Sequence, residues 1–325
     1  MAIDTGNRLA AVDQDLPTWD DTRAAGVFNE HRRLLTSVAY RVLGRWSDAE
    51  DVVQDAWLRW SGSDYAKVED PKAFLVTVTT RLAIDQLRKV QTRKESYVGP
   101  WLPEPVLTRD GADSAPDAAD RVVLDDTVSL AMLLVMETLS PLERAVFVLR
   151  EAFDYSFAEI AAMLDRSEAA VRQLLVRART HVHEKRPRYP LDDAQRQSIA
   201  DRFLSACVGG DIRPLLELLS PDVTLVADGG GVITAARRPV LGQDHVARFL
   251  LGIVDKYSKY MQQGMDLRIE VVDGGVNGAP AIVAFADGKV LYVYTLDLDE
   301  DGRIRTVFGM ANPEKLDGVR ALEQM

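Results

Sequence analysis

A change of hydrophobic period along the chain sets the strongest limit on how it can fold. From Thr22 to Tyr97 apolar residues recur at helical spacing, with Pro71 as the only proline of that stretch. From Leu267 to Phe308 apolar and polar residues alternate instead, which is the period of a strand. One segment cannot satisfy both periods. We therefore expect separate helical and α+β domains, in a chain of 325 residues that exceeds one ordinary core.

Prolines and turn dipeptides place the domain boundaries. Four prolines between residues 98 and 120 exclude a long helix and predict a linker. Helical spacing returns from Arg121 and ends before Pro187. Beyond residue 191, helical patterns give way to alternating runs separated by Asn-Gly and Asp-Gly dipeptides, which favour tight hairpins. We predict two all-α domains, over 22–97 and 121–187, joined by the linker 98–120. An α+β cone, a curved antiparallel sheet with helices, follows over 191–325.

The segment from Ser156 to Val182 has the pattern of a helix-turn-helix. Two apolar stripes flank a three-residue turn, and Ser167 is placed to cap the second helix. With that stripe buried, the side chains left on other faces are Glu168, Arg172, Gln173, Val176, Arg177 and Arg179. Arginine and glutamine can pair with base edges, and basic groups can hold phosphates. The pattern favours a helix that reads duplex DNA over a helical hairpin with a solvated basic face.

A second basic concentration runs from Lys72 to Lys94, where Asp85 is the only acid. The loop before it carries Tyr65. Single-stranded bases bind by stacking on aromatic rings and by phosphate contacts, so this loop and helix form a candidate site for melted DNA. By itself the charge run also fits an ordinary solvated helix face.

The stretch from Asp48 to Trp60 is predicted to be an amphipathic helix with an acidic face, in contrast to the basic segment above. Its apolar stripe leaves an acidic face made of Asp48, Glu50, Asp51, Gln54 and Asp55. DNA would repel such a face. A basic protein partner fits it better.

In order and spacing, these three stretches resemble the extracytoplasmic-function (ECF) sigma factors over residues 22–185. Residues 48–58 are similar to that family's core-polymerase-binding helix, and residues 70–75 with 81–88 to its promoter-melting and minus-10-reading helices. Residues 139–144 with the helix-turn-helix are similar to region 4, which reads the minus-35 element. Many relatives carry Asn where this chain has Arg81, so the minus-10 bases that this chain reads cannot be inferred from the wider family.

The resemblance implies a role for each matching residue. Polymerase, bound through the clamp helices of its beta-prime subunit and its beta flap, would meet Asp51, Gln54 and Asp55. The minus-10 strand would meet Tyr65, Lys72, Arg81, Arg88 and Lys89. The minus-35 duplex would meet Glu168, Arg172, Gln173, Arg177 and Arg179.

Three further motifs resemble the SigJ-like subgroup of these factors, which carries a SnoaL-like C-terminal domain. They are residues 101–105, 228–231 and 312–316. The resemblance implies that this domain regulates the rest of the chain. We predict that it packs on the first helical block and on the linker, through Trp101, Leu102, Pro103, Asp228, Asn312 and Lys315. For Trp101, a simple linker anchor is an equally open interpretation.

The C-terminal cone is expected to have an apolar interior that can hold a small ligand. Asp228 and His245 are the only candidate acid and base inside it that we find, and they make no convincing pair, so we expect no catalysis and no cofactor. His181 and His183 do not share a helix face, so they predict no metal site.

Charge and cysteine content indicate how and where the chain works. A net charge of -11 argues against nonspecific coating of DNA, so DNA must be reached through local basic patches on a chain joined to the polymerase. Cys207 is the only cysteine, and no apolar run is long enough for a bilayer. We expect a cytoplasmic protein without a membrane partner.

Two other classes stay open at this stage. A helix-turn-helix regulator with a ligand-sensing domain would bind its operator without polymerase. An isomerase or hydrolase fused to a DNA-binding module would show turnover that depends on Asp228 or His245. The acidic helix and the basic loop and helix favour the sigma-factor interpretation.

Overall fold

The first helical domain is a three-helix bundle. The structure is a computed structural model that describes residues 20–94, 97–108, 129–183 and 192–324. Its first elements are α1 (Asp21–Leu43), α2 (Trp46–Ser61), the 3-10 turn η1 (Tyr65–Lys67) and α3 (Pro71–Lys94). The Asp20 carboxylate caps α1, and Gly44 ends it in the left-handed region at φ 71°. The fully buried Trp60 donates its indole N–H to the Ala24 carbonyl at 2.9 Å, which ties α2 to α1.

The second helical domain contains the expected helix-turn-helix. Its helices are α5 (Leu130–Met136), α6 (Pro141–Glu151), α7 (Phe157–Leu164) and α8 (Glu168–His183). Capping boxes begin α6 and α7, each with a serine and a glutamate three residues later. Asp165 takes a left-handed φ of 53° to close α7, and the Ser167 hydroxyl accepts the Ala170 amide at 3.2 Å to begin α8. The turn and the cap confirm the sequence prediction.

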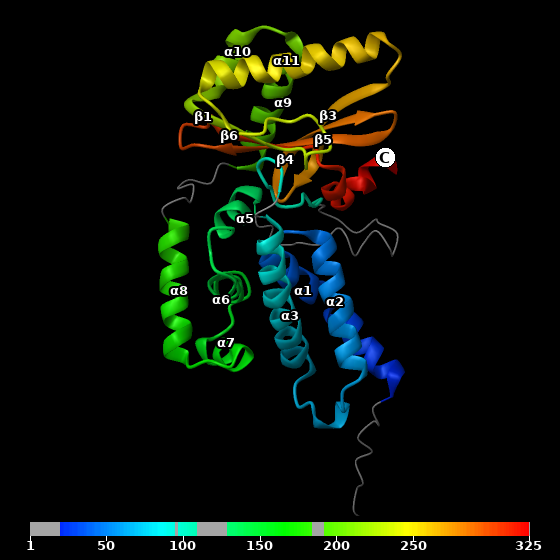
Figure 1. Cartoon of the computed structure of the whole chain (residues 1–325), viewed down its shortest axis with the longest axis vertical. Helices are drawn as coiled ribbons and strands as arrows, with labels where there is room; N and C mark the ends of the chain where they lie inside the picture. The colour runs from blue at the N-terminus through cyan, green and yellow to red at the C-terminus, as the bar shows by residue number, and fades with distance from the viewer. Residues whose placement is uncertain (1–19, 95–96, 109–128, 184–191, 325) are drawn as a thin grey trace, which may run out of the picture.

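The two helical domains share one apolar core. Helices α1 and α3 of the first pack against α6 and α7 of the second, and they lie side by side below the sheet in Figure 1. Arg144, 1% exposed, crosses this interface: it donates to the Arg41 carbonyl at 3.2 Å and to Glu137 at 2.6 Å. In this arrangement the two helical domains are therefore in direct contact.

The C-terminal domain packs helices on one face of a six-stranded sheet. The helices are α9 (Asp193–Gly209), α10 (Ile212–Leu218) and α11 (Gln243–Gln262). The strands are β1 (Leu219–Asp228), β2 (Val240–Leu241), β3 (Leu267–Val276), β4 (Ala279–Ala286), β5 (Lys289–Leu298) and β6 (Ile304–Met310), in the order β2-β1-β6-β5-β4-β3. The 3-10 turns η2 (Pro313–Lys315) and η3 (Asp317–Gln324) end the described chain. In Figure 1 the sheet separates α9–α11 from the helices of the two N-terminal domains.

Four of these strands match the alternating runs read from the sequence. Asn277-Gly278 and Asp287-Gly288 each take two positive φ values, which a two-residue hairpin turn requires. The strand β1 was missed, and it pairs parallel with β6, so the sheet is an antiparallel meander extended by one parallel strand. Its period-2 signal is short because Pro221 and Asp222 interrupt the start of the run.

Within residues 20–94, 97–108, 129–183 and 192–324, no helix combines the length and hydrophobicity that crossing a bilayer demands. The same residues contain no cluster of three or more His, Cys, Asp or Glu side chains placed to hold a metal ion.

Candidate functional site

The acidic face of α2 is open to solvent. Asp51, Gln54 and Asp55 are exposed, and Leu58 beside them is 60% exposed. Asp48 differs from the sequence prediction. It is 7% exposed, lies 3.6 Å from the Arg45 guanidinium and accepts the Gln86 amide at 3.2 Å. The α2 N-terminus packs against neighbouring elements, so Asp48 helps hold the bundle instead of facing a partner.

The DNA-reading side chains expected on α8 all lie at the surface. Glu168, Arg172, Gln173, Val176, Arg177 and Arg179 are exposed. At about 3.6 residues per turn, Gln173 and Val176 fall near the centre of this arc, opposite the buried Val171. Val176 is 64% exposed, an apolar group suited to a thymine methyl. The sequence pattern predicted that Val176 is exposed but indicated no role for it.

Two of the α8 arginines are held by neighbours. Arg172 pairs with Glu168 at 3.0 Å, and its guanidinium lies 4.1 Å from the centre of the Phe157 ring. Arg179 pairs with Glu151 of α6 at 2.7 Å. These pairs are exposed and contribute little stability. They orient the guanidinium groups over the surface.

The candidate minus-10 surface of α3 faces the helix-turn-helix. Arg81 donates its Nε–H to the Met163 carbonyl at 2.7 Å, at the C-terminal end of α7, where the helix dipole favours a cation. Lys72, Arg88 and Lys89 are exposed, and Arg88 pairs with Asp85 at 2.9 Å. Tyr65 packs its ring 4.9 Å from that of Trp60. Of these residues, Arg81 bonds to α7 through its side chain.

A buried ion pair joins the linker to the C-terminal domain. The Lys315 ammonium lies 2.7 Å from Asp228 Oδ2, with side chains 2% and 0% exposed. The Leu102 amide donates to the same carboxylate at 2.9 Å, and the Leu102 carbonyl accepts from Lys315 at 2.8 Å. The ion pair therefore hydrogen-bonds both the amide and the carbonyl of Leu102. The Trp101 ring covers the ammonium at 4.0 Å.

Two further side chains complete this network. Tyr97 donates its hydroxyl to Asp228 Oδ1 at 2.6 Å, and the Asn312 amide donates to Tyr97 at 2.7 Å. Burial and the adjacent Asp228 carboxylate raise the pKa of Tyr97, so the phenol stays a donor. Trp101, Leu102, Asp228, Asn312 and Lys315, which the sequence predicted as interdomain residues, come together here. Pro103 is buried next to them and faces Gly44, at the end of α1.

A second junction joins the first helical domain, the linker and the C-terminal domain. It was not predicted from the sequence. Tyr40 of α1 donates its hydroxyl to the Glu104 carbonyl at 2.7 Å and accepts the Asn277 amide at 2.7 Å. Asn277 also accepts the Val106 amide at 3.1 Å. Asn277 had been interpreted only as a hairpin residue, because nothing local in the sequence marks a turn that also serves as a contact.

The linker also supplies the missing N-terminal cap of α2. Arg45 at the cap position makes no side-chain cap, and Glu104 accepts the Trp46 amide at 2.8 Å instead. The Glu104 side chain is fully buried, and this burial raises its pKa against the opposing effect of Arg45 and the α2 amides. Residues 97–108 are a packed segment of the core rather than a passive tether, and residues 109–120 of the predicted linker lie outside the described residues.

Asp228 and His245, the candidates for acid-base catalysis, do not come together as a pair. Asp228 is fully buried in the ion pair with Lys315. His245 is exposed, with Nδ1 3.2 Å from the Leu241 carbonyl.

The comparisons with known proteins agree with the order of these surfaces. The family Sigma-70 region 2 matches residues 27–93, and Sigma-70, region 4 matches residues 129–182. The ECF RNA polymerase sigma factor SigJ of Mycobacterium tuberculosis is 39% identical over 90% of this chain and 92% of its own. The chain belongs to the ECF sigma factors. It is not an enzyme, and the rival classes raised from the sequence are set aside.

Other relatives extend the likeness through the C-terminal domain. The probable ECF RNA polymerase sigma factor SigI of the same species is 32% identical over 91% of this sigma factor and 96% of its own chain. The crystal structure of M. tuberculosis SigJ superposes with a TM-score of 0.69, at 36% identity, over 90% of this chain and 98% of that one. Sigma factors bind core RNA polymerase and promoter DNA. The helices over a curved sheet fit the architecture expected for residues 191–325.

Proposed function

We propose that the C-terminal domain of this sigma factor restrains promoter recognition by holding regions 2 and 4 against each other. The observation that carries the proposal is the Arg81–Met163 contact, which joins the minus-10 surface of α3 to the helix-turn-helix at 2.7 Å. The minus-10 and minus-35 elements are about 25 base pairs apart, or about 85 Å of B-DNA at the usual rise. Two touching domains cannot read both elements at once, so the chain must open.

The C-terminal domain contacts every part that would have to move. Its sheet packs on the linker residues Leu102 and Leu107, on Leu130 of α5 and, through Asn277, on Tyr40 of region 2. Residues 97–108 cannot extend while they pack on this sheet. Their release would add at most about 40 Å of extended chain between the two regions. Docking therefore shortens the reach between the two reading units.

The polymerase-binding face stays available in this closed arrangement. We propose that the exposed Asp51, Gln54 and Asp55 meet the beta-prime clamp helices, and that region 4 meets the beta flap. Polymerase can therefore engage region 2 before the chain opens. The binding free energy would then offset the closed contacts, because a partner that prefers the open form shifts the equilibrium toward it.

Opening is expected to be visible as a change in distance between the two regions. Fluorophores at Glu30→Cys on α1 and Ala158→Cys on α7, in a Cys207→Ala background, should transfer energy efficiently in the free chain. Transfer should fall when core polymerase and promoter DNA are added, and stay high with promoter DNA alone. Efficient transfer in the initiating complex would contradict the proposed opening.

Minus-35 recognition is assigned to the exposed arc of α8. Gln173→Ala and Arg177→Ala should each lower initiation at the cognate promoter by roughly 5- to 150-fold, since one good base contact contributes about 1–3 kcal/mol. Run-off transcription with core polymerase on minus-35 variants measures the effect. Each substitution should also flatten the dependence on the bases that it reads. The control is Arg213→Ala, at an exposed arginine of the C-terminal domain. If Gln173→Ala or Arg177→Ala lowers initiation no more than this control does, that residue does not belong to the recognition surface.

A further inference from the structure

An apolar cavity of about 140 Å³ opens between the helices and the sheet of the C-terminal domain. Helices α9 and α11 form one wall, and the strands β3, β4 and β5 form the other. Phe203, Leu250 and Ile282 line its deeper part, and Met261, 48% exposed, lies at its rim. The volume is close to that of an engineered apolar cavity that holds a benzene-sized molecule. This cavity has no role in the sigma-factor surfaces described above.

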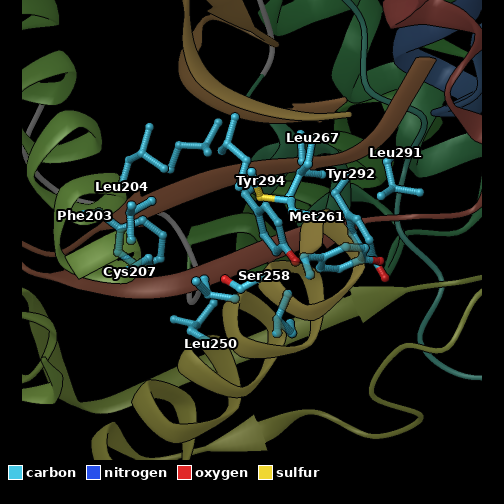
Figure 2. Close-up of a pocket in the computed structure, with 17 residues that line it drawn as sticks. Phe203, Leu204, Cys207, Leu250, Ser258, Met261, Leu267, Leu291, Tyr292 and Tyr294 are labelled. Carbon is cyan, nitrogen blue, oxygen red and sulfur yellow. The ribbon is translucent and has the colours of Figure 1, made fainter. Parts of the chain in front are cut away.

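The hydroxyl groups of the cavity lining come from α11 and β5. Figure 2 shows Tyr292, Tyr294, Met261 and Ser258 around the same part of the cavity. The rings of Tyr292 and Tyr294 are stacked at 5.8 Å, and Tyr257 meets Tyr292 edge-on at 5.7 Å. Burial raises the pKa of both Tyr257 and Tyr294, so these phenols remain neutral. Apolar walls with a few hydroxyl groups at one end are typical of sites for small, largely apolar molecules.

The lining also indicates which ligands are excluded. None of the residues that line the cavity is charged, and an ion without a partner pays a large desolvation penalty in such surroundings. A neutral molecule with one hydroxyl or carbonyl group can instead bury its body against the aliphatic wall and hydrogen-bond to a tyrosine hydroxyl. A ring system of about ten non-hydrogen atoms is of suitable size for an open-rimmed cavity of about 140 Å³.

The cavity and the docking interface lie on opposite faces of the same strands. On β4, Ile282 and Ala284 line the cavity, whereas Val283 between them packs with Leu102 in the interdomain core. On β5, Val293 lies between the cavity residues Tyr292 and Tyr294 and faces the same core. One layer of backbone thus separates a ligand from the linker contacts.

We propose that this cavity binds a small neutral molecule with an apolar body and one hydrogen-bonding group, and that its occupancy is coupled to docking of the linker. The coupling rests on the function proposed above, whereas the binding does not. Because coupling is reciprocal, a change in docking must change ligand affinity by the same factor as the ligand changes docking.

Binding is tested with 1-naphthol as the probe, by titration calorimetry on the full chain. Saturable 1:1 binding is expected, at least tenfold tighter than that of 1-naphthalenesulfonate, a charged analogue. Ser258→Phe, which adds bulk from the exposed side, and Ala284→Leu, which fills the inner wall, should each weaken binding at least tenfold. Ala194→Leu, an exposed and size-matched change on α9, should leave it unchanged.

The reactivity of a cysteine provides a second, independent measurement of binding at the same site. Cys207 lines the cavity, and burial raises its pKa to about 12. Bound 1-naphthol should slow modification of this single thiol by methyl methanethiosulfonate several-fold. Absence of 1-naphthol binding, or binding that both filling variants leave intact, overturns the site.

The coupling has its own test. Asp228→Ala, which breaks the linker contact without lining the cavity, should change the affinity for 1-naphthol at least threefold. An unchanged affinity would overturn the proposed coupling but not the proposed binding site. If instead Asp228→Ala fails to alter transcription while 1-naphthol binds as expected, the proposed restraint fails and the binding site stands.

Discussion

Asp228→Ala is expected to release the linker from the C-terminal domain. Removing one partner of a buried ion pair leaves the other charge uncompensated, at a cost of about 3–5 kcal/mol. Here the Lys315 ammonium loses the Asp228 carboxylate, and the Leu102 amide loses its acceptor as well. The amides of Leu102, Glu104, Val106 and Leu107 should then exchange hydrogen roughly 150- to 5,000-fold faster, measured by mass spectrometry on the linker peptide. Run-off transcription with core polymerase should rise, because the closed contacts weaken.

Two companion variants separate the ion pair from general damage. Asp222→Ala removes an exposed acid from the same strand, one that accepts the Ser220 hydroxyl at 2.8 Å, and should change exchange little. The double variant Asp228→Ala, Lys315→Met removes both charges and should recover part of the lost protection. Equal exchange in Asp228→Ala and Asp222→Ala would mean that the pair does not hold the linker.

Reversing the charge of the α2 face is expected to prevent assembly with polymerase. In Asp51→Lys, Asp55→Lys, two exposed acids become bases opposite a partner that the acidic face implies to be basic. Like charges brought together across an interface cost several kcal/mol, so the dissociation constant for core polymerase should rise at least 100-fold. The free energy of unfolding should stay within about 0.5 kcal/mol of the parent's, because neither side chain is buried. Fluorescence anisotropy of labelled sigma factor with core polymerase measures the first effect.

The matched control carries the same charge change elsewhere. Glu30→Lys, Glu300→Lys alters two exposed acids, on α1 and on the turn before β6, and raises the net charge by the same amount. It should bind core polymerase like the parent. If both double variants bind equally weakly, long-range charge would explain the loss and the α2 face would have no special role.

Local patterns were enough to identify much of this protein. The helix-turn-helix could be predicted because a cap at Ser167, a short turn and two apolar stripes lie within one continuous stretch. The hairpins of the C-terminal sheet followed from Asn277-Gly278 and Asp287-Gly288, whose positive φ values few other residues accept. The exposure of Asp51 and Asp55 followed from the period of α2 alone.

The contacts between domains depend on information that no local pattern holds. No local pattern around Arg81 indicates its bond to Met163, 82 residues away. Asn277 was expected only to turn a hairpin, and it bonds to Tyr40, 237 residues away. Asp48 was assigned to the solvent side of α2, but the chain before the helix and the neighbouring α3 bury it.

The sequence by itself determined the helices, the hairpins and the set of charged surfaces, because caps, periods and turn residues act over a few neighbouring positions. Only the tertiary structure decided which of these surfaces are open, that linker residues 102–107 are buried, and that Asp228 and Lys315 meet. The physical reason is that desolvation and ion pairing depend on which distant groups exclude water from a side chain. That is set by the packing of the whole chain.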